Sequence, residues 1–175
     1  LYRAVIAAES GATSGDLPDQ MFRDAITQLQ GGEAADLFRA YNNYGGVLFA
    51  RARDRVHNHA FQMASGVTAP LSTALADWSG ALEQYQLALA QAAKLPPTLA
   101  AVVKVNIAQL YALLADMIRV LDYSPDGKRE FIAGEEAATA TAREYAAAAG
   151  TKSEALDAVT RGSAHEVLAQ LAFRA

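Results

Sequence analysis

The feature that most constrains this chain is alanine, which accounts for 40 of its 175 residues, with Pro and Gly placed between the alanine-rich stretches. Alanine has the highest intrinsic helix propensity, whereas Pro and Gly end helices. Apolar residues recur with the helical period of 3.6, and the alternation of apolar and polar residues that is typical of strands is missing. The chain is therefore predicted to be all-α.

Pro and Gly divide the chain into a short N-terminal segment and a row of helices. Residues 1–15 are predicted to form an arm or a short helix, and residues 16–175 a single helical-bundle domain. Because the connections are short, consecutive helices should lie antiparallel. We expect an up-and-down bundle of four long helices plus the shorter N-terminal helix or arm. The expected helices cover residues 16–30, 33–64, 68–94, 98–122, 126–149 and 151–173.

Composition argues against several classes of function. The formal net charge is -4 and cysteine is absent. A general nucleic-acid binder normally carries a basic excess, so nucleic acid is an unlikely partner on this composition. Without Cys the chain has no disulfides, no thiolate nucleophile and no Cys-based zinc site.

The compartment is left open by the sequence. The chain begins at Leu1, so we allow for a targeting segment that has been removed, and for a periplasmic or organelle-lumen location. The most apolar stretch, Thr98–Tyr123, is long enough to span a membrane but contains Lys104, Asp116 and Arg119. Charges at mid-bilayer are costly, so this stretch is predicted to be a buried helix and not a membrane span.

No catalytic or cofactor-binding constellation is recognisable. His57 and His59 are two residues apart, which points them in nearly opposite directions around a helix, so they cannot chelate one metal ion together. The Glu135–Glu136 pair lacks the Glu-x-x-His partners of a di-metal bundle. Neither a nucleophile elbow nor a phosphate-binding loop is present. We therefore predict no enzyme activity, no cofactor and no metal.

One candidate contact is a basic row within residues 51–59. Arg51 and Arg55 are four residues apart and share a helix face, and His59 continues the row. Such a row can bind phosphate, carboxylate or an anionic partner surface. The alternative is an ordinary solvated face, on which Asp54 pairs with the two arginines.

A second candidate is the segment Tyr41–Gly46, in which Tyr41 and Tyr44 bracket two Asn residues and Gly45 and Gly46 follow. Adjacent glycines inside a helix each cost about 1 kcal/mol relative to Ala. Either the helix breaks here to admit a ligand or another chain, or a neighbouring group packs very close to the backbone. A kink where two bundle helices cross is the structural interpretation that we favour.

Alanine is densest in residues 133–149, which makes this helix nearly smooth and suited to close packing on a neighbour. With no catalytic constellation, the favoured hypothesis is a structural or interaction subunit that docks by its helix faces onto a larger assembly or onto copies of itself. A helical sensor or carrier for a small ligand is an alternative, although no convergent polar cluster is evident in the sequence. A coat subunit of a filament or capsid, with Arg51, Arg53 and Arg55 on nucleic acid, is another.

The last two predicted helices, residues 126–150 and 151–173, and the start Lys128–Ile132 resemble the end of the PsbQ-type four-helix extrinsic subunits on the lumenal side of photosystem II. The resemblance covers about a third of the chain and includes no diagnostic motif, so we do not assign the chain to that family. It implies a further alternative, an extrinsic lumenal subunit of a photosynthetic or respiratory membrane complex.

Overall fold

A computed structural model describes residues 17–64, 71–121, 132–150 and 158–173. These residues form six helices packed against each other, and no strand occurs among them. The all-α prediction is confirmed. The helices are α2 (Leu17–Leu29), α3 (Ala34–Ala64), α4 (Ser72–Ala92), α5 (Pro97–Leu121), α6 (Ile132–Gly150) and α7 (Ala158–Phe173).

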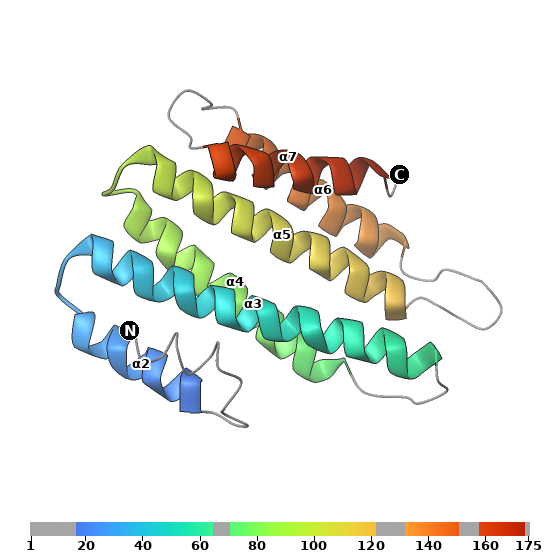
Figure 1. The fold of residues 1–175 in the computed structure, drawn as a ribbon, viewed down its shortest axis with the longest axis horizontal. Coiled ribbons are helices and arrows are strands. Elements are labelled where there is room, and N and C mark those ends of the chain that lie inside the picture. Colours follow the sequence, from blue (N-terminus) through green and yellow to red (C-terminus); the bar gives the residue numbers. More distant parts are fainter. Residues whose placement is uncertain (1–16, 65–70, 122–131, 151–157, 174–175) are drawn as a thin grey trace.

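The helices group around two neighbours, α3 and α5 (Figure 1). Helix α4 packs along α3 and also contacts α5, whereas α3 and α5 touch each other only sparsely. Helix α2 lies on α3, and α6 and α7 lie on α5 at the opposite side of the molecule (Figure 1). Helix α5 is therefore the element that joins the two sides.

The helix ends follow the Gly and Pro positions. Helix α2 ends at Leu29, because Gly31 adopts a left-handed φ of 80° and the Gly32 amide donates to the Leu29 carbonyl at 2.9 Å. Pro96 and Pro97 separate α4 from α5, and Pro97 occupies the first turn of α5, where its missing N–H costs nothing. From their residue types and positions, Asp16, Thr68 and the pair Thr151 and Glu154 are predicted helix caps, and all of them lie outside the described residues.

Narrow buried stripes, spaced three or four residues apart, hold α4 and α6 in place. On both helices the stripe is mostly alanine and contains a single acidic residue, Asp77 on α4 and Glu135 on α6. Small side chains let neighbouring helix backbones approach closely. The α4 stripe is Ala74, Asp77, Ala81, Tyr85, Ala88 and Ala92, and the α6 stripe is Glu135, Ala138, Ala142, Ala146 and Ala149.

The core differs between the two sides of the molecule. Where α2, α3, α4 and α5 meet, large aromatic and aliphatic side chains fill the space, including Phe22, Tyr44, Tyr85 and Ile107. Where α5, α6 and α7 meet, one buried cluster is Ala108, Ala112, Ala142, Ala146, Val167 and Leu171, and a second is Ala101, Val105, Ala149 and Ala164. The smooth alanine face predicted for residues 133–149 thus packs, along its buried stripe, inside this chain.

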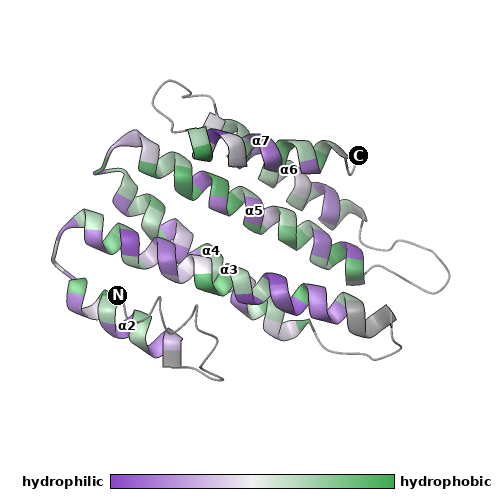
Figure 2. Cartoon of the chain, in the orientation of Figure 1, coloured by the Kyte–Doolittle hydropathy of each residue, from purple (hydrophilic) through white to green (hydrophobic). Residues whose placement is uncertain are grey.

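Helix α5 is apolar along most of its length (Figure 2). Within it, residues Pro97–Val120 are long and apolar enough to cross a membrane, and half of the most apolar window is buried inside the protein. Buried residues of α5 include Val103, Ile107 and Leu110. Length and composition would suit a membrane span, and the core helix of a water-soluble domain has the same properties.

Candidate functional site

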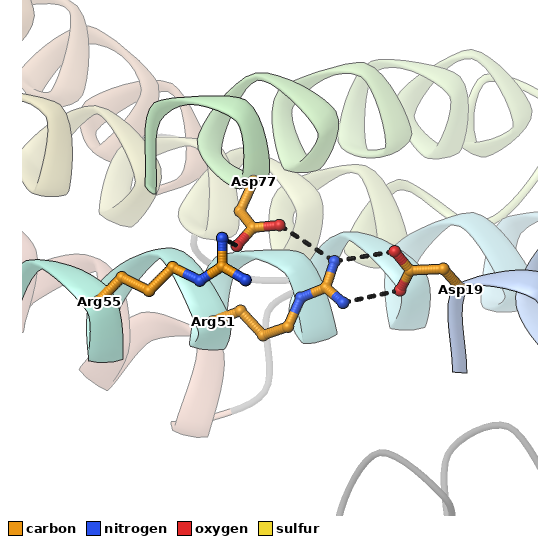
Figure 3. Close-up of polar contacts among 4 residues, drawn as sticks. All are labelled: Asp19, Arg51, Arg55 and Asp77. Atoms are coloured by element: carbon orange, nitrogen blue, oxygen red, sulfur yellow. Dashed lines mark hydrogen bonds and ion pairs between the residues drawn. The ribbon is translucent and has the colours of Figure 1, made fainter. Parts of the chain in front are cut away.

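The basic row on α3 is engaged by carboxylates of neighbouring helices (Figure 3). Arg51 donates from Nη1 and Nη2 to the two carboxylate oxygens of Asp19 on α2, at 2.9 and 3.0 Å. Its Nη2 also donates to Oδ1 of Asp77 on α4 at 3.0 Å, and Arg55 Nη1 lies 3.1 Å from Asp77 Oδ2. Arg51 therefore connects α2, α3 and α4 through one guanidinium group.

This arrangement follows from helix periodicity. Arg51 and Arg55 are one helical turn apart on α3, so both reach the same carboxylate. Asp77 occupies a core-facing position of α4 and is 8% exposed, which requires a partner for its charge. Burial alone would lower the pKa of Arg51, but the hydrogen bond to Asp19 and the charge of Asp77 outweigh burial and raise it.

The partners differ from the pairing expected for a solvated face. Asp54 was expected to pair with Arg51 and Arg55, but it lies 3.6 Å from Arg53, and the partners of Arg51 and Arg55 are Asp19 and Asp77. The reason is that Arg51 and Arg55 lie toward α4, where a buried carboxylate needs compensation. A signal for Asp77 was present in the sequence, since it is a lone acid on an otherwise apolar helical stripe. Contact of the row with an anionic partner stays a prediction.

The two histidines of the segment lie in different environments, as their spacing indicated. His57 is exposed, whereas His59 is 6% exposed and continues the buried face of Ala52 and Val56. Neither ring nitrogen of His59 has a hydrogen-bond partner within the part of the chain that the structure describes. His59 is thus separated from solvent and does not extend the row of Arg51 and Arg55.

The segment Tyr41–Gly46 contains no helix break, because α3 is continuous from Ala34 to Ala64. Instead, a neighbouring side chain packs very close to the α3 backbone, which is the second of the two alternatives. A Cβ atom on Gly45 would lie 2.8 Å from the ring of Tyr85 on α4, a distance that such atoms essentially never adopt. Gly45 is therefore the notch into which the Tyr85 ring fits.

The two tyrosines of this segment are buried core residues. Tyr44 stacks on Phe22 of α2 with ring centroids 5.0 Å apart, and the Tyr41 hydroxyl accepts a hydrogen bond from Gln30 at 3.2 Å. Burial raises the pKa of Tyr44, and the nearby charge of Asp19 adds to the effect. Both side chains hold α2 and the α2–α3 connection against α3, which is a structural role.

A groove of about 610 Å³ lies between α3 and α5, with Tyr85 of α4 among its lining residues. It joins the two segments that the sequence singled out, because its α3 wall runs from Asn42 through Gly46 to Arg51. At one point the groove is bridged by Asn106 of α5, whose Nδ2 donates to Asn42 Oδ1 at 2.9 Å. The structure thus assembles a polar cluster that was not evident from the sequence.

The groove residues missed by sequence reasoning are Asn106 and Gln109 of α5. They are amides within the most apolar helix of the chain, and this contrast was the available signal. Among the described residues, no three His, Asp or Glu side chains come together as a metal site requires. The groove lining comprises amides, a guanidinium, a carboxylate and a phenol together with apolar side chains.

Comparisons with models of known protein families, with curated proteins and with solved structures find no match to this chain. Function is therefore inferred from the geometry of the chain alone.

Proposed function

We propose that this chain is a non-enzymatic interaction subunit that docks through an outer helix face onto another protein subunit. Its scaffold would be an up-and-down bundle of the four long helices α3, α4, α5 and α6, with α2 and α7 attached at either side. In this proposal the buried stripes hold the scaffold together, and an exposed face with few charges binds the partner.

The observation that carries the proposal is the outer face of α4. Across the 21 residues of α4 the only charged side chains are Asp77, which is buried, and Glu83. Leu75 and Leu87 flank this face and are 50% and 37% exposed. Depletion of charge is one feature of the centre of protein interfaces. The outer face consists of Ser72, Ala76, Ser79, Glu83, Gln86 and Ala90.

The partner that fits this face is another helix with few charges. The outer-face residues are three or four apart and are small at four of the six positions, so they form shallow ridges and grooves into which a second helix can pack closely. The exposed side of α6 fits less well, because Glu136, Arg143 and Glu144 interrupt its alanines. This comparison favours α4 over the alanine-rich helix that the sequence singled out.

Substitution of the α4 face tests the proposal. The chain and the variant Ala76→Arg/Ala90→Arg are cross-linked in an extract of the native source, and the product masses are compared with those of the purified chain. We expect a defined cross-linked species with the unmodified chain and its loss in the variant. The matched control Ala140→Arg/Ala147→Arg adds the same two charges to exposed positions of α6 and should retain the species.

Two outcomes would contradict this function. A purified chain that stays monomeric and gives no defined cross-linked species has no stable partner. Equal loss in the α4 variant and in Ala140→Arg/Ala147→Arg would indicate a general effect of added charge. Circular dichroism of each variant confirms that the helices remain, since Ala and Arg have similar helix propensities.

A further inference from the structure

The groove between α3 and α5 has the size and the lining of a small-molecule site. Its volume of about 610 Å³ falls within the range of roughly 300–1,000 Å³ typical of ligand pockets. Four of its lining residues are carboxamides, two from α3 and two from α5, and one from each helix meet in a hydrogen bond across the groove. These residues are Asn42, Asn43, Asn106 and Gln109.

The carboxamides retain hydrogen-bonding capacity. Each amide group offers two N–H donors and an acceptor oxygen. The bond from Asn106 to Asn42 uses one donor and one acceptor, which leaves the Asn42 amino group and the Asn106 carbonyl oxygen for other partners. Within the described residues, no hydrogen bond from the side chains of Asn43 or Gln109 is present. Donors and acceptors are therefore mixed along both walls.

The charged groups at the groove do not favour a charged ligand. Both Nη atoms of Arg51 already donate to Asp19, and one also donates to Asp77. Arg51 Nε is buried without a hydrogen-bond partner among the described residues, but an anion that bound both Nη atoms would have to displace these carboxylates and leave them partly buried without their partner. Asp54 lies at the solvent side and close to Arg53. The ligand that best fits these surroundings is uncharged.

The aromatic lining does not favour a flat ligand such as a nucleobase. Stacking on a base requires an open aromatic face. The Tyr85 ring is packed against Gly45 and is 2% exposed, so its faces are covered by the protein. The other aromatic lining residue, Phe49, has the Arg53 guanidinium over its ring, 6.0 Å from the centroid. Its hydroxyl lies beside Gly46, 3.9 Å from where a Cβ would stand. Hydroxyl groups both donate and accept, so they can bond to the donors and the acceptors of the carboxamides.

From this geometry we infer that the groove between α3 and α5 binds an uncharged polyhydroxylated small molecule, of the size of a cyclitol or a neutral monosaccharide. The carboxamides of Asn42, Asn43, Asn106 and Gln109 would bond its hydroxyl groups. Gly46 leaves space for the ligand, because it is the lining residue that carries no side chain. The inference does not depend on docking through α4.

The experiment titrates the purified chain with myo-inositol, D-glucose and D-galactose, and follows the side-chain amide signals of Asn and Gln by NMR. We expect saturable shifts of a few amide signals with at least one of the three compounds, at a Kd of about 1 mM or tighter. Glucose 6-phosphate and adenosine serve as the charged and the flat probes. Each should bind at least about tenfold more weakly than the best neutral compound.

Two variants keep the inference falsifiable. Gly46→Leu fills the groove while improving helix propensity, so it should fold and bind at least about tenfold more weakly. Gln109→Leu removes one carboxamide at similar volume and should also weaken binding. The matched control Gln28→Leu, at an exposed position of α2, should bind as the unmodified chain does.

The inference is overturned if none of the three neutral compounds gives saturable shifts, or if Gly46→Leu binds with unchanged affinity. It is equally overturned if glucose 6-phosphate or adenosine binds more tightly than every neutral compound. The α4 variant Ala76→Arg/Ala90→Arg should retain binding, so failure of the docking proposal and failure of this inference are distinguishable.

Discussion

The α3–α4 pair and the α5–α6 pair are built on the same plan but are filled differently. In each pair the second helix presents a buried stripe of alanines with one acidic residue, and that acid pairs with arginine on the first helix. Asp77 pairs with Arg51 and Arg55, and Glu135 accepts from Arg119 Nε at 2.9 Å. The difference lies two stripe positions beyond the acid, where α4 has Tyr85 and α6 has Ala142.

This single difference accounts for much of the contrast between the two sides. A large ring between α3 and α4 requires a notch, which Gly45 supplies. An alanine at the equivalent place needs no notch, and both Ala142 and Ala146 are fully buried. Alanine stripes therefore hold helices together by close approach, whereas the aromatic pair depends on shape complementarity between one ring and one glycine.

The largest expected effect is that of Tyr85→Ala, which gives α4 a stripe like that of α6. Truncation of a buried aromatic ring leaves a cavity, because α3 and α4 cannot fully close over the lost volume. We expect a loss of about 3–5 kcal/mol in the free energy of unfolding, measured by urea denaturation. A loss below about 1 kcal/mol would mean that the two helices re-pack in the manner of α5 and α6.

The reverse change, Ala142→Leu, should cost less. The α6 stripe is fully buried and close-packed, so a larger side chain forces the helices apart. The expected loss is about 1–3 kcal/mol in the free energy of unfolding. Ala147→Leu, at an exposed position of the same helix, is the matched control and should change stability by less than about 0.5 kcal/mol. Equal effects of both substitutions would argue against a close-packed stripe.

The sequence predicted the helices better than their contacts. Pro96–Pro97 and Gly31–Gly32 placed two connections correctly, because helix breaking is a local property of these residues. The pairing of Arg51 with Asp19 and Asp77 was missed, since it depends on how α2 and α4 lie against α3. The notch at Gly45 could be stated only as one of two alternatives, because the residue that fills it is 40 positions further along the chain.

The groove was missed for the same physical reason. Asn42 and Asn106 belong to different helices, and nothing local to either residue indicates that they meet. The alanines of α6 were recognised as a contact surface, but the sequence alone left open whether they contact this chain or another. Periodicity identifies which residues share a face, whereas the partner of that face is determined by tertiary packing.

Two glycine substitutions, one on each side of the molecule, test the same comparison with smaller expected changes in stability. Gly45→Ala gains about 1 kcal/mol of helix propensity but drives Cβ into the Tyr85 ring, which costs about 1–3 kcal/mol. The net expectation is a loss of about 1 kcal/mol, measured by thermal unfolding. Gly162→Ala in α7 has no atom within 4 Å of the new Cβ and should stabilise the chain by about 0.5–1 kcal/mol. Stabilisation by Gly45→Ala as well would show that the Tyr85 ring moves freely.

Ionisation of the tyrosines on the α3–α4 side is expected to have the smallest effect on stability near neutral pH. Burial raises the pKa of Tyr85 and of Tyr44 in the folded chain, whereas a tyrosine in the unfolded chain ionises near about pH 10. The unfolded chain therefore loses its tyrosine protons first, so stability is fully present below about pH 10 and falls as the pH rises above it.

Urea unfolding at pH 7 and at about pH 11 measures this loss, and Tyr85→Phe should reduce it because the ring remains and the ionisable hydroxyl is gone. If Tyr85→Phe and the unmodified chain lose the same stability at alkaline pH, the loss arises from ionisable groups other than Tyr85. Ala142, the α6 counterpart of Tyr85, has no ionisable side chain. The alkaline sensitivity attributed to Tyr85 should therefore arise where α3 and α4 meet, the same place at which the two helix pairs differ in packing.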